Sequence, residues 1–210
     1  MNASIAIAPI EPAEIEAAVR IFFDGFGDNV RRLYGDPPKP DAMVDVWTFA
    51  RALEPGGFLA AHVDGRLVGY ALFTSSVHTL QRAALTSGCV FAWGLRAITG
   101  RYGLRWSALF GQLWNKMLFA GSSSAYRTTG DAQLLNIAVA SAARGHGAAT
   151  LLVAQGLRYL HTRGIEEVRL EVQPDNAPAI AAYARCGFHE RGRLRNVYGD
   201  WIVMTARPPA

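Results

Sequence analysis

A short stretch of small and basic residues in the second half of the chain could hold a phosphate. It has the sequence RGHGAA and lies between the strand pattern LLNIAV and the helical pattern TLLVAQGL. Small residues let backbone N–H groups approach a bound anion, and the positive end of the following helix adds attraction. We therefore predict a pyrophosphate site formed by Arg144, Gly145, His146, Gly147, Ala148 and Ala149.

Two side chains farther along the chain could exchange protons. Glu171 lies in the strand pattern LEV, whose apolar neighbours favour a half-buried carboxylate, and such a group can act as a base. Asn176 can cap the next helix, and Tyr183 follows it by seven residues, about two helical turns, on nearly the same face. The phenol of a tyrosine at that position can donate a proton.

These segments together resemble the GCN5-related N-acetyltransferase superfamily, known as GNAT. The second segment carries the spacing N-x-x-A-x-x-x-Y-x-x-x-G-F, which runs from Asn176 to Phe188. The resemblance implies that acetyl-CoA is the cosubstrate, with its pyrophosphate in the 144–149 loop and its pantetheine arm near Asn176. The strand before the loop is implied to hydrogen-bond this arm through the backbone of Ile137, Ala138 and Val139.

The same resemblance assigns roles to the two proton-exchanging side chains. The segment LEVQPDNAPAIAAY is most similar to the ribosomal-protein alanine N-acetyltransferase subgroup, in which the position of Glu171 is implicated as the general base. Tyr183 is implied to lie near the thioester sulfur and to protonate the departing thiolate. Simpler interpretations stay open. Glu171 could face solvent or pair with Arg169 or Arg185, and the tyrosine could only pack its helix on the sheet.

The elements that must position these residues are those of an α/β chain. Asp64 and Gly65 form a dipeptide typical of a tight hairpin turn, between apolar strand patterns at 58–63 and 67–73. Periodicity predicts further strands at 4–8, 133–139, 167–173, 188–194 and 199–205. It predicts helices at 12–26, 41–53, 147–162 and 176–185, and a long helical block over 77–119 that Gly100 and Gly103 divide.

The resemblance implies the GNAT fold for this arrangement. We expect a single domain over residues 1–210, with an α/β (α+β) mixed sheet of about seven strands flanked by helices. The helical block belongs to an insertion at about 76–130 that follows the hairpin. Three interpretations of this insertion stay open: it packs on the core or on a second subunit, it walls the acceptor site, or it lies on a membrane surface.

Composition excludes several other classes of protein. With 50% hydrophobic and 18% charged residues, the 210-residue chain can bury a core. Cys89 and Cys186 cannot form a disulfide framework, and the five histidines lack the i, i+4 spacing of a zinc helix, so we expect no metal. We expect a cytoplasmic protein without membrane contact, because no apolar run free of charge reaches about 18 residues and the N-terminus lacks a basic segment.

The function predicted from these observations is acetyl-CoA-dependent N-acetyl transfer. The acetyl group would pass directly to a primary amine of a small molecule, a peptide or a protein N-terminus. The alternative is a non-catalytic CoA-binding regulatory or scaffold protein that uses the aromatic insertion to hold a partner. A dinucleotide-binding loop is disfavoured because Thr150 stands where the third glycine belongs. We expect no nucleic-acid partner, and the sequence leaves a homodimer open.

Overall fold

One β-sheet organises the molecule. The computed structural model describes residues 4–34, 39–103, 130–196 and 199–209. In these parts of the chain, seven strands form a sheet in the order β1-β2-β3-β4-β5-β7-β6, and the β4–β5 pair is parallel while the others are antiparallel. The strands are β1 (Ile5–Pro9), β2 (Phe58–Val63), β3 (Arg66–Thr74), β4 (Gln133–Val139), β5 (Val168–Val172), β6 (His189–Asn196) and β7 (Gly199–Ala206). The predicted mixed sheet of seven strands is confirmed.

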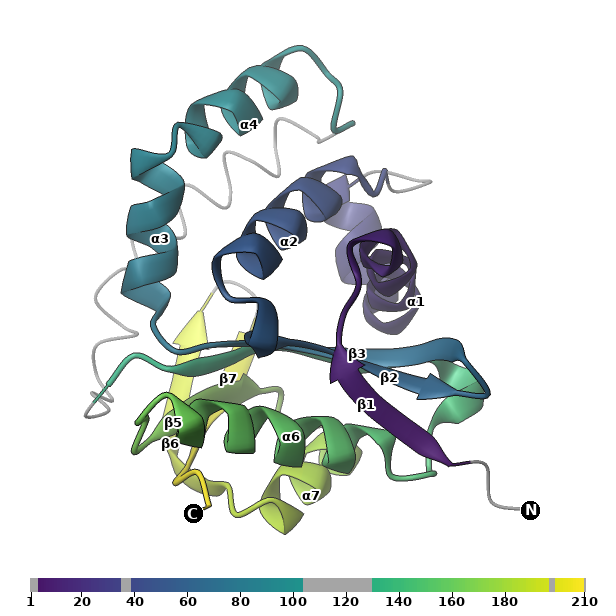
Figure 1. Ribbon diagram of the computed structural model, residues 1–210, viewed down its shortest axis with the longest axis vertical. Coiled ribbons are helices and arrows are strands. Elements are labelled where there is room, and N and C mark those ends of the chain that lie inside the picture. Colours follow the sequence, from purple (N-terminus) through teal and green to yellow (C-terminus); the bar gives the residue numbers. More distant parts are fainter. Residues whose placement is uncertain (1–3, 35–38, 104–129, 197–198, 210) are drawn as a thin grey trace.

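Helices cover both faces of this sheet (Figure 1). The helices α1 (Ile15–Tyr34) and α2 (Asp41–Leu53) lie on one face, and α6 (Ala148–Thr162) and α7 (Ala177–Arg185) lie on the other. The predicted phosphate loop, Asn176 and Tyr183 therefore belong to the side of the sheet that α6 and α7 cover.

Side-chain alternation along the strands builds a core on each face. Phe58 and Leu59 are neighbours on β2 and are both buried, but they belong to different clusters. Phe58 packs with Trp47 of α2 and Tyr70 of β3, whose ring centroids lie 4.8 Å apart. Leu59 packs with α6 residues such as Leu157. Successive side chains of a strand point to opposite faces of the sheet, and here each face has its own core. The central strands are therefore apolar on both sides.

A glycine sets how closely α6 approaches the sheet. A Cβ built at Gly156 would lie 2.0 Å from Cε2 of Phe73, a β3 side chain that is 1% exposed. No larger residue fits at this position unless the aromatic ring moves. Gly156 therefore fixes the depth of the helix whose N-terminus faces the predicted phosphate loop.

The hairpin turn and most element positions agree with the sequence predictions. Asp64 and Gly65 both have positive φ, 50° and 73°, as the tight turn requires. The first long helix differs, because α1 continues to Tyr34 where the sequence predicted an end at residue 26. Its interior contains Gly27 with φ 36° and ψ −107°, so the helix passes through a kink there.

The helical block after the hairpin is divided earlier than predicted. It begins with α3 (Val77–Thr86) and α4 (Cys89–Ile98), and these helices are separated at Gly88, which has φ 75°. The predicted division at Gly100 and Gly103 follows the end of α4, and both of these glycines have positive φ. The rest of the predicted block lies outside the described residues.

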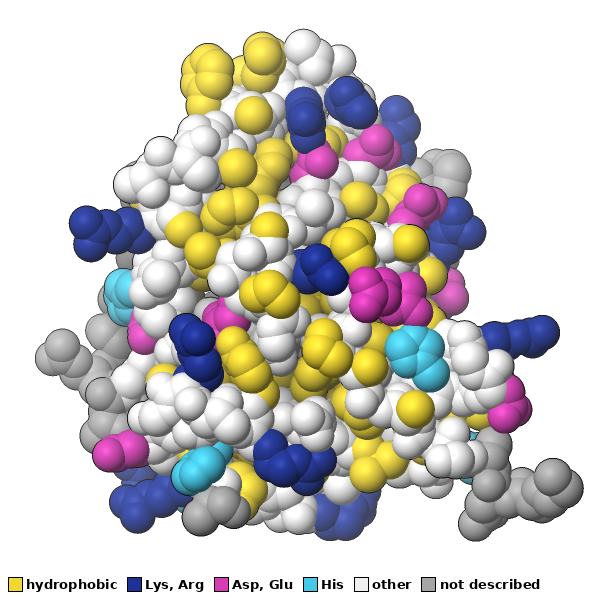
Figure 2. Space-filling model, in the orientation of Figure 1, with side chains coloured by type: hydrophobic (Ala, Val, Ile, Leu, Met, Phe, Trp, Pro, Cys, Tyr) yellow, Lys and Arg dark blue, Asp and Glu magenta, His cyan; other side chains and the backbone are white. Residues whose placement is uncertain are grey.

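The α3 and α4 helices form an arm that stands beside α2 (Figure 1). One side of α4 packs on α2, through the Phe49–Trp93 ring contact and an ion pair between Asp45 and Arg96. Hydrophobic side chains gather at the top of the molecule in Figure 2, where Figure 1 places α4. The exposed apolar side chains of the arm are Leu85, Val90, Phe91, Leu95 and Ile98. The structure thus shows α4 packed against the domain on one side and exposed on the other. No described helix is both long and apolar enough to cross a membrane.

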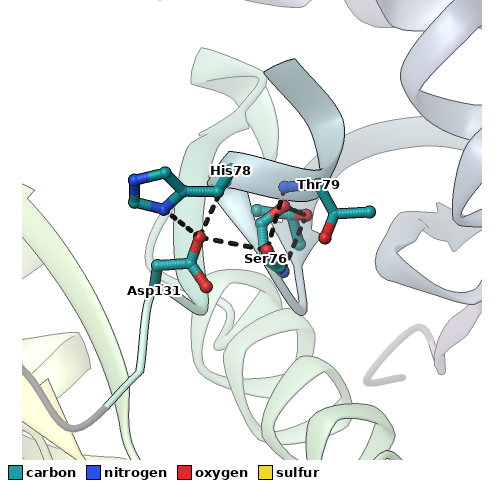
Figure 3. A network of polar contacts seen from close by, with 5 residues as sticks. Ser76, His78, Thr79 and Asp131 are labelled. Atoms are coloured by element: carbon teal, nitrogen blue, oxygen red, sulfur yellow. Dashed lines mark hydrogen bonds and ion pairs between the residues drawn. The ribbon is translucent and has the colours of Figure 1, made fainter. Parts of the chain in front are cut away.

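The chain leaves the sheet for the arm and returns to it at one polar cluster (Figure 3). Asp131, just before β4, accepts hydrogen bonds at Oδ2 from the Ser76 hydroxyl (3.0 Å) and the His78 backbone N–H (2.7 Å). Nδ1 of His78 lies 2.6 Å from the same oxygen. The Ser76 Oγ also caps α3 by accepting from the N–H of Thr79 (3.0 Å). The backbone closes the cluster, since Val77 N–H donates to the Asp131 carbonyl.

We expect Asp131→Asn to destabilise the fold by about 1 kcal/mol at pH 7. Burial alone would raise the pKa of Asp131, but the hydrogen bonds from His78 and Ser76 and the charge of His78 outweigh it and lower that pKa. A lowered pKa stabilises the folded state above the ordinary aspartate value, and this stability is lost as the pH falls below that value. Urea unfolding should therefore separate wild type and variant at pH 6, and the difference should shrink as the pH falls through the lowered pKa of Asp131. Asp175→Asn, at an exposed aspartate, is the control. A difference independent of pH would contradict the charge effect.

Candidate functional site

The sheet opens where β4 and β5 part. These parallel strands pair at one position, Gln133 with Arg169, and at this junction the Arg169 N–H donates to the Ala132 carbonyl at 3.0 Å. Farther along, β4 continues to Val139 paired with β3, while β5 continues paired with β7. The carboxyl-terminal half of β4 therefore has one edge without a neighbouring strand in the described sheet.

Backbone groups of β4 face this opening. Ala140 N–H donates to the Val68 carbonyl at 2.8 Å, so Ala140 faces β3. Because the backbone N–H and C=O groups of successive residues point to alternate edges of a strand, those of Val139 and Ile137 point away from β3 and towards the opening. The Val139 carbonyl agrees with this orientation, since it accepts from Nε of Arg144 at 3.0 Å. Of the three strand residues predicted to contact the cofactor, two direct their backbone into the opening, and Ala138 pairs with β3.

Glycines shape the turn from β4 to α6. Gly145 and Gly147 have φ of 83° and 87°, a left-handed backbone that other residues rarely adopt. The first turn of α6 closes with the bond from Leu151 N–H to the Gly147 carbonyl at 3.1 Å. The N–H groups of Ala148, Ala149 and Thr150 precede this bond and point out of the helix end. Such a set of amides, at the positive end of the helix dipole, is suited to a phosphate.

The two longer side chains of the loop contact its backbone. Arg144 is exposed, and its guanidinium turns back to the end of β4, where it bonds Val139. Nδ1 of His146 lies 2.9 Å from the Arg144 carbonyl. The structure thus brings the predicted loop and strand residues together at one end of the sheet, with the loop conformation supported by its own side chains.

The α7 helix places Asn176 and Tyr183 below the same half of the sheet. The Asn176 Oδ1 accepts from the N–H of Ala179 at 3.2 Å, so the predicted helix cap is observed. Tyr183 is 7% exposed, and its ring centroid lies 6.0 Å from that of Phe188. Burial raises the pKa of Tyr183 to about 12. Its phenol therefore carries a proton at neutral pH and has the protonation state of a donor.

Cys186 lies just beyond α7 and packs against the start of α6. Its Sγ lies 3.5 Å from the Thr150 carbonyl. Burial raises the pKa of the Cys186 thiol, against a smaller opposing effect of Arg185. A thiol that keeps its proton is a poor nucleophile, so this environment favours a packing role.

Glu171 faces away from α6 and α7. Its neighbours Leu170 and Val172 are buried in the core on that side, whereas Glu171 points to the opposite face and is 27% exposed in its side chain. Its Oε1 accepts from Nη2 of Arg169 at 2.6 Å. Of the alternatives left open by the sequence, the pair with Arg169 is the one observed. The carboxylate lies two residues past the β4–β5 pair, where the strands have separated.

Two features of the site were missed in the sequence analysis. The register of β3 with β4 shifts between Leu72 and Phe73, so Leu135 is an extra, bulged residue of β4. Because of this bulge, the backbone groups of both Leu134 and Ile137 face the edge of β4 that lies towards β5. No residue type in LLNIAV marks the bulge. Gly156 was also missed, although a glycine inside a helical pattern is a signal of close packing.

Comparison with known proteins agrees with this geometry. Residues 106–188 match the family described as the acetyltransferase (GNAT) family. A mycothiol acetyltransferase from Catenulispora acidiphila is 38% identical over 87 residues, which cover 41% of this chain and 27% of the relative. The chain thus spans well under two thirds of the length of that curated relative.

Solved structures share the fold over nearly the whole chain. The protein described as SsHAT has a TM-score of 0.70 and 25% identity, with 99% of this chain and 100% of that one covered. YncA from Salmonella typhimurium, described as a putative acetyltransferase with its cofactor acetyl-CoA, has a TM-score of 0.60 and 15% identity, covering 98% and 94%. A ribosomal-protein-alanine N-acetyltransferase from Brucella melitensis has a TM-score of 0.59 and 19% identity, covering 96% and 99%.

A mixed sheet that splits between two parallel strands, with a glycine turn and a helix N-terminus at the split, defines a class of acetyltransferase folds. Over residues 106–188 the chain matches the GNAT family of acetyltransferases, and over nearly its whole length it shares the fold of SsHAT. The family resemblance predicted from the sequence is confirmed, including the shared fold with ribosomal-protein alanine N-acetyltransferases.

Gly147→Ala should weaken acetyl-CoA binding about tenfold, because a Cβ at positive φ strains the turn and tilts its amides. Gly164, at the other end of α6, has a φ of 72° and provides the matched control. Both variants should lose similar stability, and only the first should change the Kd measured by calorimetry. Equal affinity of the two variants would place the phosphate outside this turn.

Proposed function

We propose that this protein is an acetyl-CoA-dependent N-acetyltransferase that acts on a primary amine. The observation that carries the proposal is the split between β4 and β5, which exposes the backbone of Ile137 and Val139 beside the amides at the start of α6. A pantetheine arm is an extended amide chain that can hydrogen-bond a strand edge, and a diphosphate suits a helix N-terminus. The residues present therefore fit this cosubstrate.

Acetyl-CoA would supply the acetyl group as a thioester. The amine must be neutral to attack, and we assign Glu171 as the base that accepts its proton. A C–N bond forms as the C–S bond breaks, and Tyr183 donates a proton to the sulfur. Its pKa of about 12 keeps this phenol protonated beforehand. Backbone N–H groups of β4 would stabilise the charge on the carbonyl oxygen. The products are an N-acetyl amide and a free thiol.

The acceptor is proposed at the level of a primary amine in a small molecule, a peptide or a protein N-terminus. The opening between β4 and β5 meets the sheet face that bears Arg169 and Glu171, so the amine would approach from the side opposite α6 and α7. We further propose that residues 1–210 act as one domain in the cytoplasm, and we leave a homodimer open.

Thiol release tests this function. The protein is incubated with acetyl-CoA and a panel of polyamines, aminoglycosides, amino acids and N-terminal peptides, while free thiol is followed with a chromogenic disulfide. Calorimetry measures acetyl-CoA binding in parallel. Release that depends on one class of amine supports the proposal and names the acceptor class. Tight binding without release for any amine would favour the alternative of a regulatory or scaffold protein.

A further inference from the structure

Arg169 and Glu171 form a charge pair at the point where the sheet splits. Both lie on β5 and, two residues apart, face the same side. Arg169 is the residue of β5 that pairs with β4, and Glu171 lies beyond the junction. Their side chains are 12% and 27% exposed, and Nη2 and Oε1 are 2.6 Å apart.

The strands on either side offer few charges to this pair. Across β7, Arg169 is opposite Thr205 and Glu171 is opposite Val203, which are 1% and 0% exposed. On β4 the neighbour of Arg169 is the uncharged Gln133. One strand farther away, His189 of β6 has Nε2 at 3.5 Å from the Thr205 hydroxyl. Among the described strands, Arg169 is therefore the cation placed to hold the Glu171 carboxylate.

The observed hydrogen bond fixes one carboxylate oxygen and leaves the other for a second partner. The Arg169 guanidinium donates a hydrogen bond to Oε1 of Glu171. This bond limits the rotation of the Glu171 side chain. The arrangement therefore favours a fixed orientation of the Glu171 carboxylate.

We propose that Arg169 is a positioning residue that holds Glu171 for proton transfer from the acceptor amine. This inference rests on the proposed function, since it assigns Arg169 an effect through the base. It predicts a loss in kcat that appears only while Glu171 is present. It also predicts that the KM for acetyl-CoA is unaffected, because the loop and the backbone of β4 bind that molecule.

A double-mutant cycle tests this coupling. With alanine amide as the acceptor probe, we expect Arg169→Met to lower kcat at least tenfold and to change the KM for acetyl-CoA less than twofold. Arg169→Lys should recover most of the loss. In the Glu171→Gln background, Arg169→Met should cause no further loss. Arg193→Met, which breaks the exposed pair with Glu190, is the control and should match wild type.

Unfolding in urea supplies a measurement that does not need activity. Removal of one partner of a half-buried pair leaves an unpaired charge, so Arg169→Met should lower the urea midpoint more than the Arg169→Met/Glu171→Gln double variant does. Additive losses in kcat, or wild-type kcat in Arg169→Met, would overturn the positioning role. A wild-type protein that releases no thiol with any amine would overturn the proposed function and this role together, while the urea result would still report the pair.

Discussion

Glu171→Gln should lower kcat by about 10²- to 10³-fold, because general-base catalysis contributes that much and the amide cannot take a proton. Glutamine has nearly the same size and still accepts a hydrogen bond from Arg169, so the loop and β4 should be undisturbed. We expect the KM for acetyl-CoA and its calorimetric Kd to stay within about twofold of wild type. Steady-state thiol release measures the first effect and calorimetry the second.

Two further variants show whether this loss is specific. Tyr183→Phe should slow turnover less than Glu171→Gln does, because a CoA thiolate leaves adequately with little protonation. Cys186→Ala should retain wild-type kcat if the acetyl group passes directly to the amine. Full activity in Glu171→Gln would place the base elsewhere, and a dead Cys186→Ala enzyme with intact stability would indicate a covalent intermediate.

Gly156→Ala should lower the free energy of unfolding by about 2–3 kcal/mol, through overpacking of the core. A methyl group there would lie 2.0 Å from Cε2 and 2.4 Å from Cδ2 of Phe73, and this ring is fully enclosed between β3 and α6. The clash must outweigh the gain in helix propensity of about 1 kcal/mol that alanine brings. Urea unfolding at fixed pH measures the net effect.

A second helical glycine, Gly94, separates the effect of core packing from the effect of helix propensity. Gly94 lies inside α4, and a Cβ built there meets nothing within 4 Å. Gly94→Ala should therefore stabilise the protein by up to about 1 kcal/mol. Phe73→Leu combined with Gly156→Ala should be more stable than the sum of the single changes predicts, because the smaller side chain leaves room for the methyl group. Neutral behaviour of Gly156→Ala would mean that α6 can shift on the sheet at little cost.

Local patterns account for the parts of the fold that the sequence predicted well. The hairpin follows from Asp64 and Gly65, whose types favour the positive φ that the turn requires. The phosphate loop follows from Gly145 and Gly147 in the same way, with an apolar strand before them and a helical pattern after them. Each of these features is decided within a few residues, so the sequence is sufficient to find them.

The features that were missed depend on contacts between distant segments. A glycine inside the α6 pattern signals close packing, but only the structure shows that Phe73 is the side chain packed against Gly156. The choice of Arg169 over Arg185 as the partner of Glu171 depends on the two residues facing the same side of β5. In the sequence, Gly88, Gly100 and Gly103 are equally plausible places for a helix to end. The helix-breaking tendency of glycine does not by itself show which of them separates α3 from α4.

The junction at Asp131 makes the inserted segment exchangeable. The Val77 N–H donates a hydrogen bond to the Asp131 carbonyl at 3.2 Å. Because of this bond, β3 and β4, which precede and follow the segment, keep their spacing whatever chain connects them. The segment can therefore be exchanged as a unit, and chimaeras that replace it between residues 77 and 131 would measure whether it affects the choice of acceptor.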